Sequence, residues 1–161
     1  MPLPFGWPKL TMLEVPHHRQ QGTGYCLPAC LQMVLDYVGV KRDQAQLARE
    51  LGVTPKVGVA VSRVTRLAIP KVSIRYQQGE IGDLVAALAH GIPPILNVAT
   101  GQLPYWDEDC AHAVVLVGLS DDQRIAYLND PAFDTPNIAC EASALWLAWD
   151  DAFNYYTMME T

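Results

Sequence analysis

The sequence predicts one α+β domain in which helices come first and an antiparallel sheet follows. The chain has 161 residues, of which 50% are hydrophobic and 17% are charged. This length and composition are typical of one compact domain with a sizeable core. Apolar residues recur at helical spacing in the first half, whereas the second half contains short runs rich in Val and Ile. We therefore expect residues 1–161 to form a single domain with helices N-terminal to the sheet.

Helical periodicity occurs in four segments. Apolar residues recur three and four positions apart in residues 28–38, 44–51 and 81–90, and less regularly in 57–69. Asp43 is a residue type that caps helix N-termini, so it is expected to start the second helix. Glycines, which favour helix C-termini, follow three of the segments at Gly39, Gly52 and Gly91.

Three short runs predict the strands. Residues 95–98, 113–119 and 125–128 are rich in Val, Ile and Leu and are bounded by Gly, Pro, Asn and Asp. The last two runs are joined by residues 120–123, a short polar segment of the kind that connects antiparallel neighbours. We expect these strands to form a meander.

Charge and hydropathy exclude some partners. Lys and Arg number 11 against 17 Asp and Glu, which gives a net charge of -6 and disfavours binding to phosphate backbones. No apolar run is long enough to cross a bilayer, and residues 1–5 lack the basic start of a signal peptide. We expect a cytoplasmic protein that neither binds nucleic acid nor inserts into a membrane, and the sequence leaves its oligomeric state open.

Cys26 is the first candidate for chemistry. It follows the flexible stretch Gly22 to Gly24 and precedes Pro28, a residue tolerated in a first helical turn. Its thiol is therefore expected at a helix N-terminus, where unpaired N–H groups and the helix dipole stabilise a thiolate. The alternative is a buried structural cysteine.

His112 is the best candidate for the base that such a nucleophile needs. It opens the apolar strand 113–119 and so has a rigid position, whereas His17 and His18 are expected in a solvated loop and His90 at a helix end. Asp130 ends the next strand and can orient the imidazole, although it is also a common turn residue before proline. Gln20 or Gln21, just upstream of Cys26, can donate to an oxyanion.

Three segments of the chain together resemble a known family. They are Gln20–Cys30 with the sequence QQGTGYCLPAC, residues 111–115 (AHAVV) and residues 129–131 (NDP). They are similar to the bacteriocin-processing, double-glycine cysteine peptidases and their stand-alone relatives. The resemblance implies a papain-like fold, with Cys26 on the central helix and His112 and Asp130 on the following sheet. It also selects Gln20, six positions before the cysteine, as the oxyanion donor.

The resemblance implies a cysteine peptidase that hydrolyses or transfers peptide or amide bonds. Its partner would be a peptide or protein substrate, and no cofactor or metal is expected. Many family members have an acidic residue before the cysteine and a glycine after it, where this chain has Tyr25 and Leu27.

Two other functions are compatible with the sequence. One is a catalytically inactive papain-like module that binds peptides. The other is a structural zinc site made by Cys26, Cys30, Cys110 and His112, because each pair is spaced to share a face of its helix or strand. In addition, Tyr105 and the adjacent Trp106 could line a ligand cleft or pack onto the core.

Overall fold

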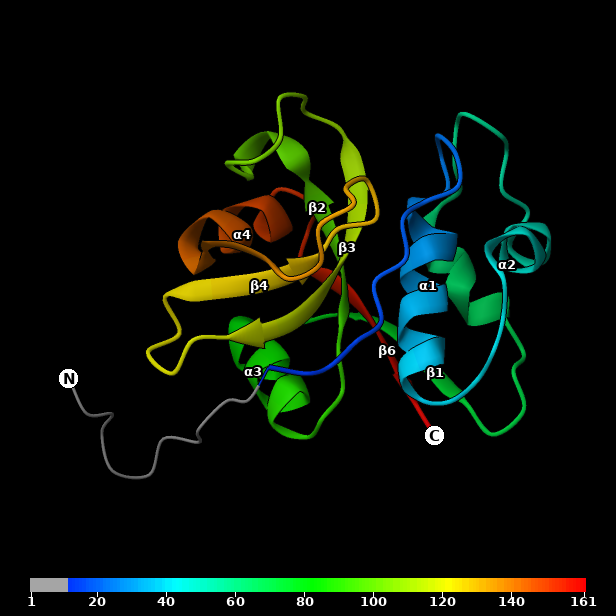
Figure 1. Ribbon diagram of the computed structural model, residues 1–161, viewed down its shortest axis with the longest axis horizontal. Coiled ribbons are helices and arrows are strands. Elements are labelled where there is room, and N and C mark those ends of the chain that lie inside the picture. Colours follow the sequence, from blue (N-terminus) through cyan, green and yellow to red (C-terminus); the bar gives the residue numbers. More distant parts are fainter. Residues whose placement is uncertain (1–11) are drawn as a thin grey trace.

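A six-stranded sheet separates two groups of helices (Figure 1). The computed structural model describes residues 12–161, so the segment in which we expect no signal peptide lies outside the described residues. The helices are α1 (Cys26–Tyr37), α2 (Gln44–Leu51), α3 (Ile81–Ala89) and α4 (Ala142–Asp150), with the 3₁₀ helices η1 (Val61–Arg66) and η2 (Thr100–Gln102). The strands are β1 (Ser73–Gln78), β2 (Ile95–Ala99), β3 (Ala111–Leu119), β4 (Ile125–Asn129), β5 (Ile138–Glu141) and β6 (Tyr155–Glu160).

The strands lie in the order β1-β6-β2-β3-β4-β5, and every neighbouring pair is antiparallel. Helices α1 and α2 lie on one side of the sheet, and α3 and α4 lie on the other (Figure 1). Successive residues of β3 consequently face different helices: Val115 packs in the cluster that contains α1, whereas Leu116 packs in the cluster that contains α4. The sheet is thus covered on both faces, which fixes the position of β3 relative to α1.

The predicted helix boundaries have the expected local causes. Asp43 caps α2 by accepting a hydrogen bond from the backbone N–H of Gln46 at 2.7 Å. The residues Gly39, Gly52 and Gly91 have φ values of 86°, 76° and 75°, a left-handed conformation that glycine adopts without a Cβ clash. None of the helices among residues 12–161 is long and apolar enough to span a bilayer.

One helix prediction is wrong in extent and type. Residues 57–69 contain only the 3₁₀ helix η1, not an α-helix. The chain turns first at Lys56 and Gly58, whose φ values are 68° and 103°, and Thr54 forms an isolated bridge with Gly58. This turn occupies the residues that would have formed the first helical turn.

The three strands predicted from Val and Ile content are confirmed as β2, β3 and β4, and β3 and β4 form the expected hairpin. Strands β1, β5 and β6 were not predicted. Strand β1 is a mostly exposed edge strand with the polar sequence SIRYQQ, and it pairs with β6 in the register Ser73↔Glu160. The α+β prediction is confirmed, with β1 as a strand that precedes α3.

Candidate active site

Cys26 is the first residue of α1, so its thiol lies at a helix N-terminus and is half-buried. The loop that precedes it is held by the turn before η1. The N–H of Lys56 donates to the carbonyl of Thr23 at 3.0 Å, and a Cβ on Gly24 would lie 2.7 Å from the backbone nitrogen of Gly58. Only glycine therefore permits this close approach, which holds the loop beside Cys26.

His112 and Asp130 form a buried pair on adjacent strands. His112 is the second residue of β3, and Asp130 directly follows β4. Nε2 of His112 lies 2.7 Å from Oδ1 of Asp130, and the two residues are 8% and 0% exposed. Because Nε2 is bound to the carboxylate, Nδ1 is the ring nitrogen left to interact with the Cys26 thiol.

The Asp130 carboxylate receives three further hydrogen bonds. Its Oδ2 accepts from the Tyr105 hydroxyl and from Nε1 of Trp106, each at 2.8 Å, and its Oδ1 accepts from the N–H of Ala132 at 3.0 Å. The Trp106 ring also contacts the His112 ring edge-on, with centroids 4.8 Å apart. Tyr105 and Trp106 therefore pack against the core and contact the His112–Asp130 pair directly. Sequence reasoning missed this contact, because nothing in a loop sequence indicates which distant carboxylate its side chains will reach.

The ionisation of Cys26 and His112 is coupled. Burial alone would raise the pKa of the Cys26 thiol, but the hydrogen bond and charge of His112 and nearby backbone N–H groups bring the pKa below its ordinary value. Burial alone would lower the pKa of His112, but hydrogen bonds and charge from Asp130 and Cys26 raise that pKa to about 9. Both shifts favour a thiolate next to an imidazolium.

The Asp130 side chain stays ionised beside His112. Burial raises the pKa of Asp130, whereas the hydrogen bonds from His112, Ala132 and Trp106 lower it, and the net pKa is below the ordinary value. The negative charge is thus kept beside the imidazole throughout the neutral range.

The two glutamines upstream of Cys26 have different environments. Gln20 is half-buried, its Nε2 donates to the carbonyl of Gly22 at 3.1 Å, and its Oε1 is buried. Gln21 is exposed, and its backbone N–H donates to Oε1 of Gln44 at 2.9 Å. Of the two side chains, that of Gln20 is held close to the loop that leads into α1.

The two residues that depart from the family pattern lie on either side of Cys26 at the start of α1. Leu27 is 1% exposed and packs in the core cluster under α1, so its side chain is part of the core. Tyr25 is the half-buried N-cap residue of α1. Cys30, one turn further along α1, is fully buried and its thiol donates to the carbonyl of Ala113 at 3.4 Å.

The zinc interpretation is wrong for the part of the chain that the structure describes. Among residues 12–161, no three His, Cys, Asp or Glu side chains are grouped so that they could hold a metal ion. Cys110 is exposed and its thiol lies 3.5 Å from the hydroxyl of Thr100. Cys30 instead uses its thiol to bind a backbone carbonyl.

The other histidines have structural contacts. Nε2 of His17 lies 2.7 Å from the carbonyl of Phe133. Both His17 and His18 are half-buried, whereas the sequence predicted that they would be solvated. His90 is the C-cap of α3, as predicted, and its Nδ1 lies 2.7 Å from the carbonyl of Ala86.

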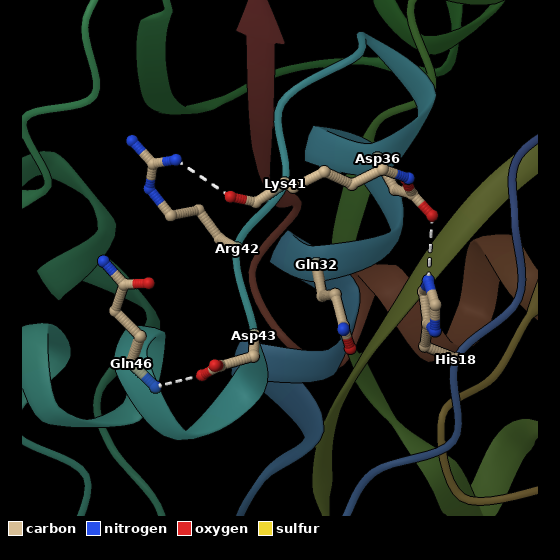
Figure 2. Close-up of a pocket in the computed structure, with 7 residues that line it drawn as sticks. All are labelled: His18, Gln32, Asp36, Lys41, Arg42, Asp43 and Gln46. Carbon is tan, nitrogen blue, oxygen red and sulfur yellow. Dashed lines mark hydrogen bonds and ion pairs between the residues drawn. The ribbon is translucent and has the colours of Figure 1, made fainter.

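A polar pocket of about 390 Å³ lies apart from these residues, between α1 and the start of α2 (Figure 2). Asp36 lies between His18 and Lys41 and contacts both side chains, whereas Asp43 accepts from the backbone N–H of Gln46. The lining residues are His18, Gln32, Asp36, Lys41, Arg42, Asp43 and Gln46. Cys26, His112 and Asp130 are not among them.

Comparison with known proteins identifies the family of the chain. The model of the Peptidase_C39 like family matches residues 12–156. The chain belongs to this family. No curated protein sequence matches the chain. The family match confirms the resemblance that the three sequence segments indicate.

Solved structures related to the C39-like fold extend over nearly the whole chain. One, described as a C39-like peptidase from Bacillus anthracis, has a TM-score of 0.76 and 20% identity, covering 94% of this chain and 98% of that one. A double glycine motif protease from an AMS/PCAT transporter, solved with the leader peptide, has a TM-score of 0.68 and 19% identity, covering 92% of each chain. Xylellain, a cysteine protease from Xylella fastidiosa, has a TM-score of 0.61 and 13% identity, covering 96% of this chain and 86% of that one. The C39-like chain described here therefore has the predicted papain-like fold.

Proposed function

We propose that this C39-like protein is a cysteine peptidase that uses Cys26 as its nucleophile. The observation that carries the proposal is the pairing of a helix-terminal thiol of lowered pKa with an imidazole of raised pKa that is hydrogen-bonded to a buried carboxylate. A structural cysteine gains nothing from such a partner, whereas a nucleophile needs one. The family membership supports the same class of chemistry.

In the proposed acylation step, the Cys26 sulfur attacks the carbonyl carbon of a peptide bond. The C=O π electrons move to the oxygen, which becomes an oxyanion. His112 then gives its proton to the leaving amine, the C–N bond breaks and an acyl-enzyme forms. Water, deprotonated by His112, cleaves the thioester and returns the thiol and the acid product. Another acceptor in place of water would give transfer instead of hydrolysis.

The oxyanion needs donors that are already in place. The Gln20 side-chain amide is our candidate, because it is held beside the loop that enters α1. The backbone N–H groups at the start of α1 are the second source of donors, since they have no partner within the helix. Asp130 would keep the His112 proton on Nε2 and leave Nδ1 for Cys26.

The substrate class that we propose is a peptide. One structural relative was solved in complex with a leader peptide, and another is a cysteine protease. The proposed chemistry requires an acyl group that Cys26 can reach, and a peptide bond satisfies this requirement.

The test is a peptide-library cleavage assay on the unmodified protein and on Cys26→Ala. Cys110→Ala is the matched control, because Cys110 is exposed and lies outside the proposed site. We expect turnover by the unmodified protein and by Cys110→Ala, and none by Cys26→Ala. Cleavage by Cys26→Ala would reject the proposed nucleophile. Peptide binding without cleavage by any variant would favour the inactive binding module instead.

A further inference from the structure

Gln44 is a buried amide whose hydrogen bonds all leave its own helix. It is the first residue of α2 and is 1% exposed. Its Nε2 donates to the carbonyl of Arg19 at 2.8 Å and to Oε1 of Gln32 at 3.0 Å, and its Oε1 accepts from the N–H of Gln21 at 2.9 Å. Because Arg19 offers a carbonyl and Gln21 an N–H, the partners determine which way the amide is turned.

These bonds fix the backbone on both sides of Gln20. The Gln44 side chain binds the carbonyl of Arg19, the residue before Gln20, and the N–H of Gln21, the residue after it. The N–H of Gln20 itself donates to the carbonyl of Pro131 at 2.7 Å. Pro131 follows Asp130, so Gln20 is tied to α2 through Gln44 and to the end of β4 through its own backbone.

The third bond of Gln44 connects this segment to α1. Gln32 lies on the helix that begins with Cys26, and Figure 2 shows its side chain projecting from α1 near Asp43 at the start of α2. The position of Gln20 relative to Cys26 is therefore set through Gln32 and Gln44, outside the loop that joins the two residues in sequence.

Helix α2 has stabilising contacts that do not involve Gln44. Asp43 supplies the N-terminal cap, and Leu47 and Leu51 supply the buried apolar contacts. Burying an amide at Gln44 costs free energy unless all its partners are present, so a polar residue here needs a reason beyond helix formation.

We propose that Gln44 is a positioning residue that holds Gln20 at the distance from Cys26 that oxyanion stabilisation requires. This inference rests on the proposed function and deepens it. Donor groups lose much of their effect when they are displaced by about 1 Å, and a displacement of that size can cost about 10²-fold in rate.

The test compares Gln44→Leu with Gln46→Leu, the same substitution two positions along α2. Among residues 12–161, the Gln46 side chain donates to Glu50 alone, outside the bonds around Gln20, so its variant should keep the rate of peptide cleavage. Gln44→Leu should lower kcat by about tenfold to 10²-fold with little change in KM. In a Gln20→Ala background, Gln44→Leu should lower kcat by less than about twofold, because the side chain that Gln44 positions is no longer present.

Equal losses in the two backgrounds would show that Gln44 acts through general stability, and no loss in the native background would also overturn the inference. A second measurement does not depend on turnover. The Gln21 amide should exchange its hydrogen faster in Gln44→Leu, while amides within α1 keep their protection. If no peptide is cleaved by the native protein, the proposed function fails, and an unchanged Gln21 exchange rate then rejects the positioning role separately.

Discussion

Nε2 of His112 lies 2.7 Å from Oδ1 of Asp130, although the two residues are 18 positions apart in the chain. The hairpin of β3 and β4 brings them together, since Val115 pairs with Asn129, the residue immediately before Asp130. The ring is consequently fixed by a sheet and not by a mobile loop. An imidazole held in this way keeps one nitrogen bound to the carboxylate and leaves the other nitrogen free.

The first prediction concerns the reactivity of Cys26. Iodoacetamide at pH about 6 to 7 should modify Cys26 much faster than Cys30, because the reactive form is the thiolate. The pKa of Cys26 is lowered, whereas burial raises that of Cys30, which is also 0% exposed. Mass spectrometry of the digested protein locates the modified residue.

His112→Ala is the companion variant for this measurement. It removes the hydrogen bond and the positive charge that lower the pKa of Cys26, so alkylation of Cys26 should slow. Equal rates for the native protein and His112→Ala would remove His112 from the role of activating base.

The second prediction is the pH dependence of peptide cleavage. The active pair needs a Cys26 thiolate and a protonated His112. Activity should therefore rise with pH as Cys26 loses its proton below its ordinary pKa, and fall as pH passes about 9, where His112 loses its proton.

Asp130→Asn tests why the peptide-cleavage activity falls at alkaline pH. It removes the hydrogen-bonded negative charge that raises the pKa of His112, so the decline should move to lower pH. The rate should also fall, by up to about 10⁴-fold if the tautomer is lost as in other triads. An unchanged alkaline limit would mean that Asp130 does not control the ionisation of His112.

The elements predicted from sequence are those with local causes. The second helix was bounded correctly because Asp43 and Gly52 act on their own backbone. Strand β1 could not be found in this way, since its polar sequence pairs with β6 about 80 residues further along and gains its order from that partner. The turn at Lys56 and Gly58 likewise depends on its contact with Thr23 and Gly24.

The same distinction applies to the candidate site. The position of Cys26 could be predicted because a helix start is visible in sequence, and the positions of His112 and Asp130 because each lies next to a recognisable apolar run. The bonds of Tyr105 and Gln44 join segments that no periodicity connects. Such contacts require the folded structure.

The third prediction separates Gln20 from Gln21. Gln20→Ala should lower kcat by about 10² to 10³-fold, the effect of removing one oxyanion donor. Gln21→Ala should have little effect, because its side chain is exposed and its structural bond uses the backbone N–H, which alanine keeps. The measurement is kcat on one cleaved peptide, with Cys26 alkylation as the control for an intact nucleophile. If Gln21→Ala lowered kcat and Gln20→Ala did not, the oxyanion donor would be Gln21, and our assignment would be wrong by one residue.

The fourth prediction concerns the two aromatic donors to Asp130. Tyr105→Phe removes only the hydroxyl that donates to Oδ2 at 2.8 Å, and Trp106 remains as the other donor to that oxygen. A hydrogen bond to a charged group contributes about 1.5–3 kcal/mol, so the free energy of unfolding should fall by about that amount at pH 7. Tyr37→Phe is the matched control, because the Tyr37 hydroxyl donates at 2.9 Å to a neutral carbonyl, that of Gly91, and should cost about 1 kcal/mol.

The pH dependence distinguishes these two tyrosine variants further. The pKa of Asp130 is lowered in the folded protein, so its charge contributes stability above the ordinary carboxyl pKa, and that stability is lost as pH falls through the folded value. Removing the Tyr105 donor raises the folded pKa of Asp130, and acid unfolding should then begin at a higher pH. Tyr37→Phe should lower stability equally at every pH, because the hydrogen bond that it removes is made to a neutral backbone carbonyl. Urea unfolding of both variants from pH 7 down to pH about 3 measures the difference, and parallel curves for the two variants would exclude Tyr105 from control of the Asp130 charge.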